Sequence, residues 1–180
     1  MNRFWLGTAV CLLLAIGLLV ALIGWGVFDP KPLGVLVWQR SLSEWEITSR
    51  EVLWLAEVEE AVFTVRGTAV YQSGERDMVA GLVVGNEADY LGVAVSPLGY
   101  VMVWQGEEML MPLQPWPHVH LGSEPNEIWL DVQGSDVTVR LNREILWVGE
   151  ANVAGGVGVV GQSWGETAVV QFPSIQLYSP

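Results

Sequence analysis

Apolar and polar residues alternate in short runs along most of the chain after residue 37. Val, Ile, Leu, Trp and Tyr recur at every second position, and clusters of Gly, Pro, Asn and Ser separate the runs about every 8–12 residues. This spacing is typical of antiparallel strands that bury one face. It predicts an all-β sandwich or barrel, with strands at residues 52–58, 61–66, 68–72, 78–84, 90–95, 100–105, 127–133, 136–141, 144–148, 156–161 and 167–177.

One hairpin is specified in detail by its turn. Residues 128–133 and 136–141 flank Gly134-Ser135, a pair that suits a two-residue type II′ turn. This turn sets a register in which one face is wholly apolar. That face holds six residues: Ile128, Leu130, Val132, Val137, Val139 and Leu141.

The other face of the same hairpin is polar, with one tryptophan. The register places Trp129 opposite Arg140 and Asp131 opposite Thr138. Because side chains alternate across a strand, Trp129 is predicted to point away from the apolar face.

The N-terminal segment has a different pattern, with no charged residue from Phe4 to Phe28. As a helix, about 25 residues at roughly 1.5 Å each reach ~37 Å, enough to cross a ~30 Å hydrocarbon core. A cleaved signal peptide would have a shorter apolar region and a small-x-small cleavage site. A lipoprotein signal would need a small residue before Cys11, where Val10 stands. The segment therefore predicts an uncleaved transmembrane anchor, flanked near its ends by Trp5 and Trp25.

The anchor divides the chain into three predicted parts: a transmembrane segment (1–28), a linker (29–37) and one domain (38–180). Arg3 and the free amine favour an N-terminus inside the cell. Lys31 on the other flank reduces the difference in positive charge between the two ends of the segment. This predicts a single-pass protein of the cell membrane with its C-terminal domain outside the cytoplasm.

Charge excludes one class of partner. The chain has 20 acidic and eight basic residues, and all the acidic residues lie at or after Asp29. Nucleic-acid binding needs cationic groups that displace counterions, so no nucleic-acid partner is expected. Cys11 is the only cysteine, which excludes a disulfide within the chain, thiolate metal sites and cysteine catalysis.

From Trp38 to the C-terminus, the order of motifs resembles the concanavalin A-like lectin/glucanase family, also called laminin-G-like. The resemblance implies a two-sheet antiparallel jelly-roll sandwich, and its motifs concern the fold rather than a ligand site. Arg143 stands where the family's turn after Asn142 has Gly. The segments that carry the resemblance are Ser43-Glu44-Trp45, residues 79–84, Asp89-Tyr90 with 91–95, Ser96-Pro97-Leu98-Gly99-Tyr100, 126–130, 137–142, 155–160 and 169–178.

The family includes β-glucanases whose active strand carries Glu-x-Asp-x-x-Glu, and the nearest match here is Glu57 with Glu59. Two positions along a strand separate these carboxylates by roughly 6.5–7 Å. A retaining glycosidase pair is closer, at about 5–5.5 Å. No third carboxylate follows in register, because position 62 is Val. The sequence predicts no catalytic residues and favours a protein that is not an enzyme.

The sequence gives equally weak evidence for metal and cofactor sites. His118 and His120 share a spacing that could offer two imidazoles on one face, but no third ligand lies nearby and an ordinary loop is favoured. Residues 86–89 supply oxygen ligands in a loop, as calcium sites of laminin-G-like domains do, and a polar turn explains them better. No cofactor is predicted, and calcium is possible without being assignable to ligands.

Tryptophan is unusually abundant: eight of the ten lie outside the anchor. Aromatic side chains anchor protein interfaces and also bind glycans. Most of the eight are expected in the core, and Trp129 and Trp116 are the candidates for a surface role. The predicted ligand or partner surface is Trp129, Arg140, Asp131 and Trp116. For Trp129, a cation–π pair with Arg140 is the alternative.

These patterns support three hypotheses of function. The first is a non-enzymatic module at the outer face of a bacterial-type membrane that recognises protein or glycan. The second is an accessory subunit of a larger membrane complex, whose small residues in the anchor permit close helix packing. The third, least favoured, is a carbohydrate-active hydrolase.

Overall fold

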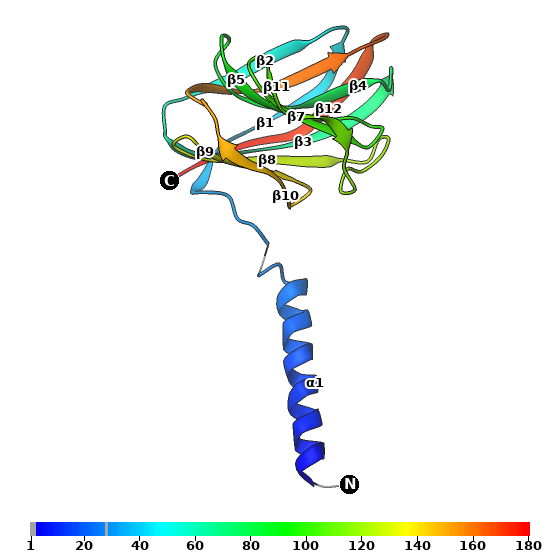
Figure 1. Ribbon diagram of the computed structural model, residues 1–180, viewed down its shortest axis with the longest axis vertical. Helices are drawn as coiled ribbons and strands as arrows, with labels where there is room; N and C mark the ends of the chain where they lie inside the picture. Colours follow the sequence, from blue (N-terminus) through cyan, green and yellow to red (C-terminus); the bar gives the residue numbers. More distant parts are fainter. Residues whose placement is uncertain (1–2, 28) are drawn as a thin grey trace. The chain divides into compact units, whose positions relative to one another are not determined.

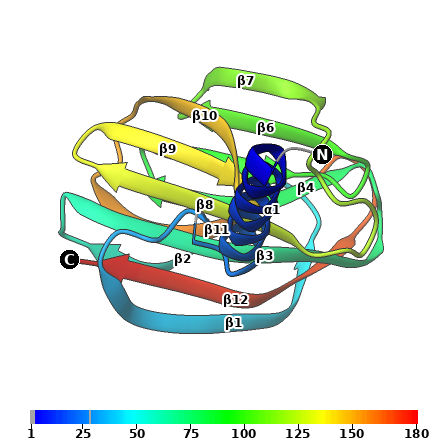
Figure 2. The ribbon, with the colours of Figure 1, turned by 90° about the horizontal axis from the view of Figure 1, so that it is seen from below.

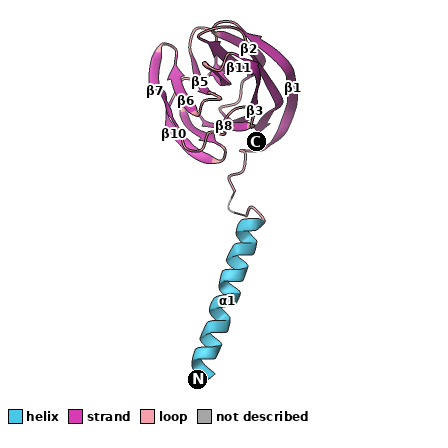
Figure 3. Ribbon diagram, turned by 90° about the vertical axis from the view of Figure 1, so that its right-hand side faces the viewer, coloured by secondary structure: helices cyan, strands magenta, loops and turns pink. Residues whose placement is uncertain are grey.

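The computed structural model describes residues 3–27 and 29–180 (Figure 1). These residues form two compact units, Met1–Lys31 and Pro32–Pro180, and each is described by itself. The first contains helix α1 (Arg3–Gly24) and the second consists of strands and the loops that join them (Figure 3).

Helix α1 comes from the uncharged N-terminal run. The side chains from residue 8 to residue 20 are exposed, and Trp25 after the helix is 79% exposed. Within the described part of the chain, no helix is both long and apolar enough to cross a membrane. The predicted flanking residue Trp5 and the end of the run at Phe28 lie outside the described side chains.

The second unit is the predicted two-sheet antiparallel sandwich. Among the described residues it has two six-stranded sheets, and their strand orders are β1-β12-β3-β8-β9-β10 (sheet A) and β2-β11-β4-β5-β6-β7 (sheet B). Figure 2 shows sheet A from its outer side, with β12 between β1 and β3. The strands are β1 (Val35–Ile47), β2 (Glu51–Val58), β3 (Val62–Gly74), β4 (Met78–Gly85), β5 (Tyr90–Val95), β6 (Tyr100–Gln105), β7 (Glu108–Pro115), β8 (Asn126–Gln133), β9 (Asp136–Leu141), β10 (Glu144–Glu150), β11 (Gly155–Ser163) and β12 (Ala168–Ser179).

The hairpin of β8 and β9 has the predicted register. Ile128 pairs with Leu141, Leu130 with Val139, and Trp129 with Arg140. Gly134 has a φ of +68°, which a type II′ turn requires at its first central position. The six apolar residues of the inner face are at most 1% exposed and belong to the core between the two sheets.

Two strands escaped the sequence pattern, and both lie at the edge of a sheet. Strand β1 begins at Val35, inside the predicted linker, and its pairing with β12 is interrupted by three register shifts. Strand β7 contains Pro112 and, among the strands that the structure describes, pairs only with β6. An edge strand tolerates bulges and proline because one row of its backbone groups needs no partner, and the same features hide its alternation.

Strand β3 joins two segments that were predicted as separate strands at 61–66 and 68–72. The expected break is Gly67, which lies inside one continuous strand. A Cβ atom at Gly67 would lie 2.7 Å from Cδ2 of Leu82 in the opposite sheet. The glycine therefore makes room for a core side chain rather than ending a strand.

Sheet B buries apolar residues on its outer face as well. A second cluster, separate from the core between the sheets, consists of Val79, Val83, Ala94, Met102, Trp104 and Val160. Val52, Trp54 and Tyr90 pack against it. The rings of Trp54 and Tyr90 thus pack over the outward side chains of the central strands of sheet B.

Candidate functional site

The outer face of sheet A carries the surface that was predicted from the sequence. Trp129 points to this face, yet only 3% of the residue is exposed. The guanidinium of Arg66, on the neighbouring strand β3, lies 4.6 Å from the centre of the Trp129 ring. The cation–π partner is therefore Arg66 rather than the predicted Arg140.

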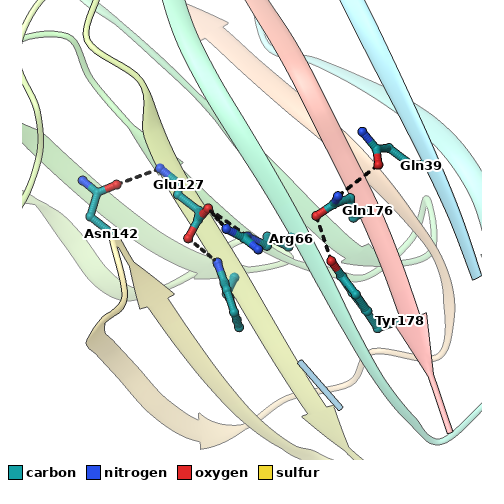
Figure 4. Close-up of polar contacts among 7 residues, drawn as sticks. Gln39, Arg66, Glu127, Asn142, Gln176 and Tyr178 are labelled. Atoms are coloured by element: carbon teal, nitrogen blue, oxygen red, sulfur yellow. Dashed lines mark hydrogen bonds and ion pairs between the residues drawn. The ribbon is translucent and has the colours of Figure 1, made fainter. Parts of the chain in front are cut away.

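Glu127 joins these two residues. One carboxylate oxygen accepts hydrogen bonds from Nε and an Nη of Arg66, and the other accepts one from Nε1 of Trp129 at 2.7 Å. Figure 4 shows Glu127 between Arg66 and Asn142, whose side-chain oxygen accepts from the Glu127 backbone N–H at 2.7 Å. Both oxygens of this carboxylate are in use, and the indole N–H and the stacked ring of Trp129 have partners.

Asp131 is held in a similar way. The hydroxyl of Thr64 donates to one carboxylate oxygen at 2.6 Å, and Nε of Arg140 lies 3.5 Å from the other. Thr64 is fully buried and also accepts a hydrogen bond from the backbone N–H of Leu33 at 2.9 Å. The predicted ligand groups on this face therefore bind one another, and a ligand role for them stays a prediction.

Farther along the same face lies a chain of polar residues. The amide of Gln176 donates to the side-chain oxygen of Gln39 at 3.1 Å and accepts from the hydroxyl of Tyr178 at 2.9 Å (Figure 4). These contacts link β1 to β12 across the edge of the sheet.

Trp116, the second predicted surface tryptophan, is partly buried. It packs against the main core, and its ring centre lies 6.1 Å from that of His118. The structure does not bring it together with Trp129 as one surface in any contact among the described residues.

The side chains of the candidate metal ligands form hydrogen bonds that stabilise the loops. Nδ1 of His120 lies 2.7 Å from the carbonyl oxygen of Pro125. The side-chain oxygen of Asn86 accepts from the backbone N–H of Ala88 at 3.0 Å, and one Asp89 oxygen accepts from the amide of Gln105 at 3.1 Å. Among the described residues, no group of three or more His, Cys, Asp or Glu side chains is arranged to hold a metal ion.

The outer face of sheet B presents a row of aromatic rings. Trp54 meets Tyr90 edge to face at 6.0 Å between ring centres, and Tyr90 meets Trp104 in the same way at 6.4 Å. Arg50 lies over Trp104, 5.0 Å from its ring centre. Trp104 itself covers Gly92, where an added Cβ would collide with the indole. Only Trp54 and Tyr90 in this row keep part of their ring surface open to a ligand.

A cleft of about 630 Å³ begins beside Trp54. Strand β2 supplies one wall and the turn after β4 supplies the other, and Gly155 and Gly156 lie between them. An added Cβ at either glycine would meet a backbone oxygen, so these glycines let the neighbouring segments pack closely. Its volume suits a small ligand or one end of a longer chain. The lining residues are Trp54, Leu55, Ala56, Glu57, Val58, Glu59, Gly85, Asn86, Glu87, Gly155 and Gly156.

A second cleft of about 730 Å³ lies next to the first. It runs between the loop after β2, the turn after β8 and the loop after β10. The two clefts share the lining residues Val58, Glu59 and Gly155, so they are neighbours at this end of the sandwich. We call the two together the end cleft.

Amide side chains hold the loops of the end cleft. The side-chain nitrogen of Asn86 donates to the carbonyl of Ala154 at 3.2 Å, and that of Asn152 donates to Asp89 at 3.2 Å. Gln105 bridges Asp89 and the carbonyl of Asn152. The loop 86–89 thus shapes the cleft, a role that the calcium hypothesis did not foresee.

The sequence reading missed this site for an identifiable reason. Trp54 was not among the tryptophans predicted to have a surface role, and Glu57 and Glu59 were considered only as a catalytic pair. The signal that could have found the site is the aromatic triplet of Trp54, Tyr90 and Trp104. The strand pairings from β2 through β11, β4 and β5 to β6 bring these three positions into one face.

Comparison with known proteins shows the fold class of this chain. No family model and no curated protein matches the chain. Among solved structures, it is similar to the carbohydrate-binding module CBM66 of Bacillus subtilis, with a TM-score of 0.61 and 10% identity over 83% of this chain and 98% of that one.

Two enzyme structures are also similar over part of their length. A fructosyltransferase of A. japonicus has a TM-score of 0.56 at 11% identity, over 79% of this chain and 26% of the enzyme. A GH43 protein of Bacillus licheniformis has a TM-score of 0.53 at 10% identity, over 68% of this chain and 28% of the enzyme. The chain thus spans about a quarter of each enzyme. At such identities the likeness shows the fold alone, a β-sandwich consistent with the predicted jelly roll.

Proposed function

We propose that this protein is a non-enzymatic glycan-binding module, and that the end cleft is its binding site. The observation that carries the proposal is the cleft itself. It combines the partly open ring of Trp54, a glycine-lined floor and several carboxylates that can accept hydrogen bonds from sugar hydroxyls. Aromatic faces with a few convergent polar groups are the usual composition of a ligand site. The likeness to a carbohydrate-binding module supports the same class of ligand.

The proposal includes a membrane tether and a concanavalin A-like, or laminin-G-like, ancestry for the sandwich. The tether is supported by the uncharged run from Phe4 to Phe28 in the sequence, and the orientation by Arg3. The domain would then present its cleft to glycans outside the cytoplasm. The family assignment is supported by the order of motifs from Trp38 onward.

A glycan array probed with the full chain in a neutral detergent tests the function. Wild-type protein is expected to retain at least one class of oligosaccharide, and Trp54→Ala is expected to weaken that binding about tenfold. This tenfold decrease in affinity corresponds to the loss of roughly 1 kcal/mol or more of binding free energy from the aromatic contact. Trp164→Ala is the matched control, because Trp164 is 46% exposed and does not line the cleft.

Four outcomes would contradict parts of this proposal. Absence of binding to every glycan would reject the function. Loss of binding in Trp129→Ala with full binding in Trp54→Ala would move the site to the outer face of sheet A. Release of shortened sugars that stops in Glu57→Gln or Glu59→Gln would identify a hydrolase. A stoichiometric protein partner in the detergent extract would favour the accessory-subunit hypothesis instead.

A further inference from the structure

The charged residues that line the end cleft indicate which class of glycan it would select. Five carboxylates line it, three of them on the segment that ends β2 and follows it, and neither Lys nor Arg lines either half. The five are Glu57, Glu59, Glu60, Glu87 and Glu150.

These carboxylates lack the partners that carboxylates on the outer face of sheet A have. Glu127 and Asp131 there form ion pairs with Arg66 and Arg140. Among the described residues, no hydrogen bond or ion pair engages the side chains of the five cleft glutamates, all of which are exposed. The negative charge of the cleft is therefore not balanced locally.

Two neutral side chains of the cleft are already engaged. Asn86 and Gln105 use their side-chain nitrogens to hold neighbouring loops, as described above. Five carboxylates remain for a ligand, beside the hydroxyl of Ser135 and the indole of Trp54, and a carboxylate in its ionised form only accepts hydrogen bonds. A ligand that donates several hydrogen bonds and carries positive charge satisfies such a site best.

We propose that the end cleft selects glycans that bear free primary amines, that is, chains of amino sugars without N-acetyl groups. This inference rests on the proposed glycan-binding function and specifies its ligand class. An ammonium group offers three donors and full charge to the carboxylates, whereas an acetylated amine offers one neutral donor. Uronic or sulfated glycans are repelled, because a hollow lined by one sign of charge concentrates ions of the opposite sign and excludes its own.

The shape of the cleft adds a requirement of length. Its two halves, of about 630 and 730 Å³, both border Glu59, and the proposal places a bound chain across this residue with sugars in each half. Trp54 provides a stacking surface in one half, and Glu60 and Glu150 provide charge in the other. Oligosaccharides are therefore bound more tightly than single amino sugars.

Calorimetry with two matched probes tests the inference. The full chain in neutral detergent is titrated with a glucosamine hexamer and with the N-acetylglucosamine hexamer of the same linkage, at low ionic strength and at a pH where the amines are charged. The free amine is expected to bind about tenfold tighter or more, as charge-assisted hydrogen bonds exceed neutral ones. Salt lowers this preference.

Variants localise the preference. Glu57→Gln, Glu59→Gln and Glu60→Gln combined are expected to reduce the ratio of the two affinities to about twofold or less, because glutamine keeps the shape of the side chain without the charge. Glu46→Gln is the matched control, since Glu46 is exposed on β1 and lines neither half. An oligolysine of equal charge tests whether charge alone suffices.

The outcomes separate this inference from the function on which it rests. Equal affinity for both hexamers, or binding only to an uncharged glycan elsewhere on the array, overturns the amine preference and leaves the glycan-binding function standing. If oligolysine binds as tightly as the glucosamine hexamer, the proposed selection of amino sugars is also overturned, because the site would then recognise positive charge without any sugar. No binding to any glycan rejects both.

Discussion

Two consecutive residues in the turn between β9 and β10 have a left-handed backbone. Asn142 has a φ of +49° and Arg143 a φ of +76°. A two-residue hairpin turn with positive φ at both positions is most easily made by Asn-Gly. Asn142 fits this rule and is held further by its side chain, which donates to the carbonyl of His118 at 2.6 Å and to the side-chain oxygen of Asn126 at 2.9 Å. Arg143 stands where glycine is preferred, so its backbone is strained.

Replacing this arginine tests the strain. Arg143→Gly is expected to be more stable than Arg143→Ala by about 1 kcal/mol, because only glycine adopts this φ without a steric cost. The two variants both remove the arginine side chain, so their difference isolates the backbone contribution. Urea denaturation followed by tryptophan fluorescence measures it, and equal midpoints would show that the turn is not strained.

At the scale of elements, the outer face of sheet A is organised by buried polar contacts between strands. The hydroxyl of Thr64 on β3 accepts a hydrogen bond from the backbone N–H of Leu33 and donates one to Asp131 on β8. It thereby fixes the segment before β1 to the middle of the sheet. Since Thr64 is fully buried, water cannot replace these bonds without opening the face.

Thr64→Val keeps the shape of the side chain and removes its hydroxyl. We expect a loss of about 1–3 kcal/mol in the free energy of unfolding, because a buried N–H and a carboxylate oxygen lose their partner. Thr68→Val, on the same face of the same strand, is the control, since Thr68 makes no side-chain hydrogen bond among the described residues. Thermal denaturation compares the two; a loss equal in both variants would show that β-sheet context, not the hydrogen bonds, sets the stability.

At the scale of the whole molecule, the chain divides into the unit that holds α1 and the sandwich, and their environments are predicted to differ. The proposed anchor requires the apolar run to partition into lipid. A charged side chain at the centre of a membrane helix costs about 2.5–3.5 kcal/mol on insertion scales. Two such charges should prevent insertion of a single helix.

Fractionation tests the anchor. Wild-type protein is expected to stay in the membrane pellet after an alkaline wash, and Leu14→Arg with Leu18→Arg is expected to move to the supernatant. Leu121→Arg, at an exposed position of the sandwich, is the control and should remain in the pellet. Recovery of wild-type protein in the supernatant would reject the anchor, and a shortened N-terminus by mass spectrometry would indicate a cleaved signal.

Much of the sandwich could be predicted because its information is local. Alternation along a strand states which side chains face inward, and the Gly134-Ser135 turn sets the register of its hairpin within a few residues. Ile128 and Val137 therefore fell on the buried face without any knowledge of the rest of the fold. Edge strands such as β7 lacked this signal, because one row of their backbone groups is unpaired and irregularity is tolerated.

The availability of the outward side chains was decided only by tertiary structure. Periodicity placed Trp129 on the outer face, but Arg66, from another strand 63 positions away, covers its ring. Trp54 and Glu150 come to line neighbouring clefts through strand pairings that no short pattern encodes. The alternation of a strand depends on its own backbone geometry, whereas exposure and pockets depend on which distant segments pack beside it. For this protein, the sequence by itself therefore determined most of the inner strands and their buried face, and the assembled sheets determined which outward side chains are open to a ligand.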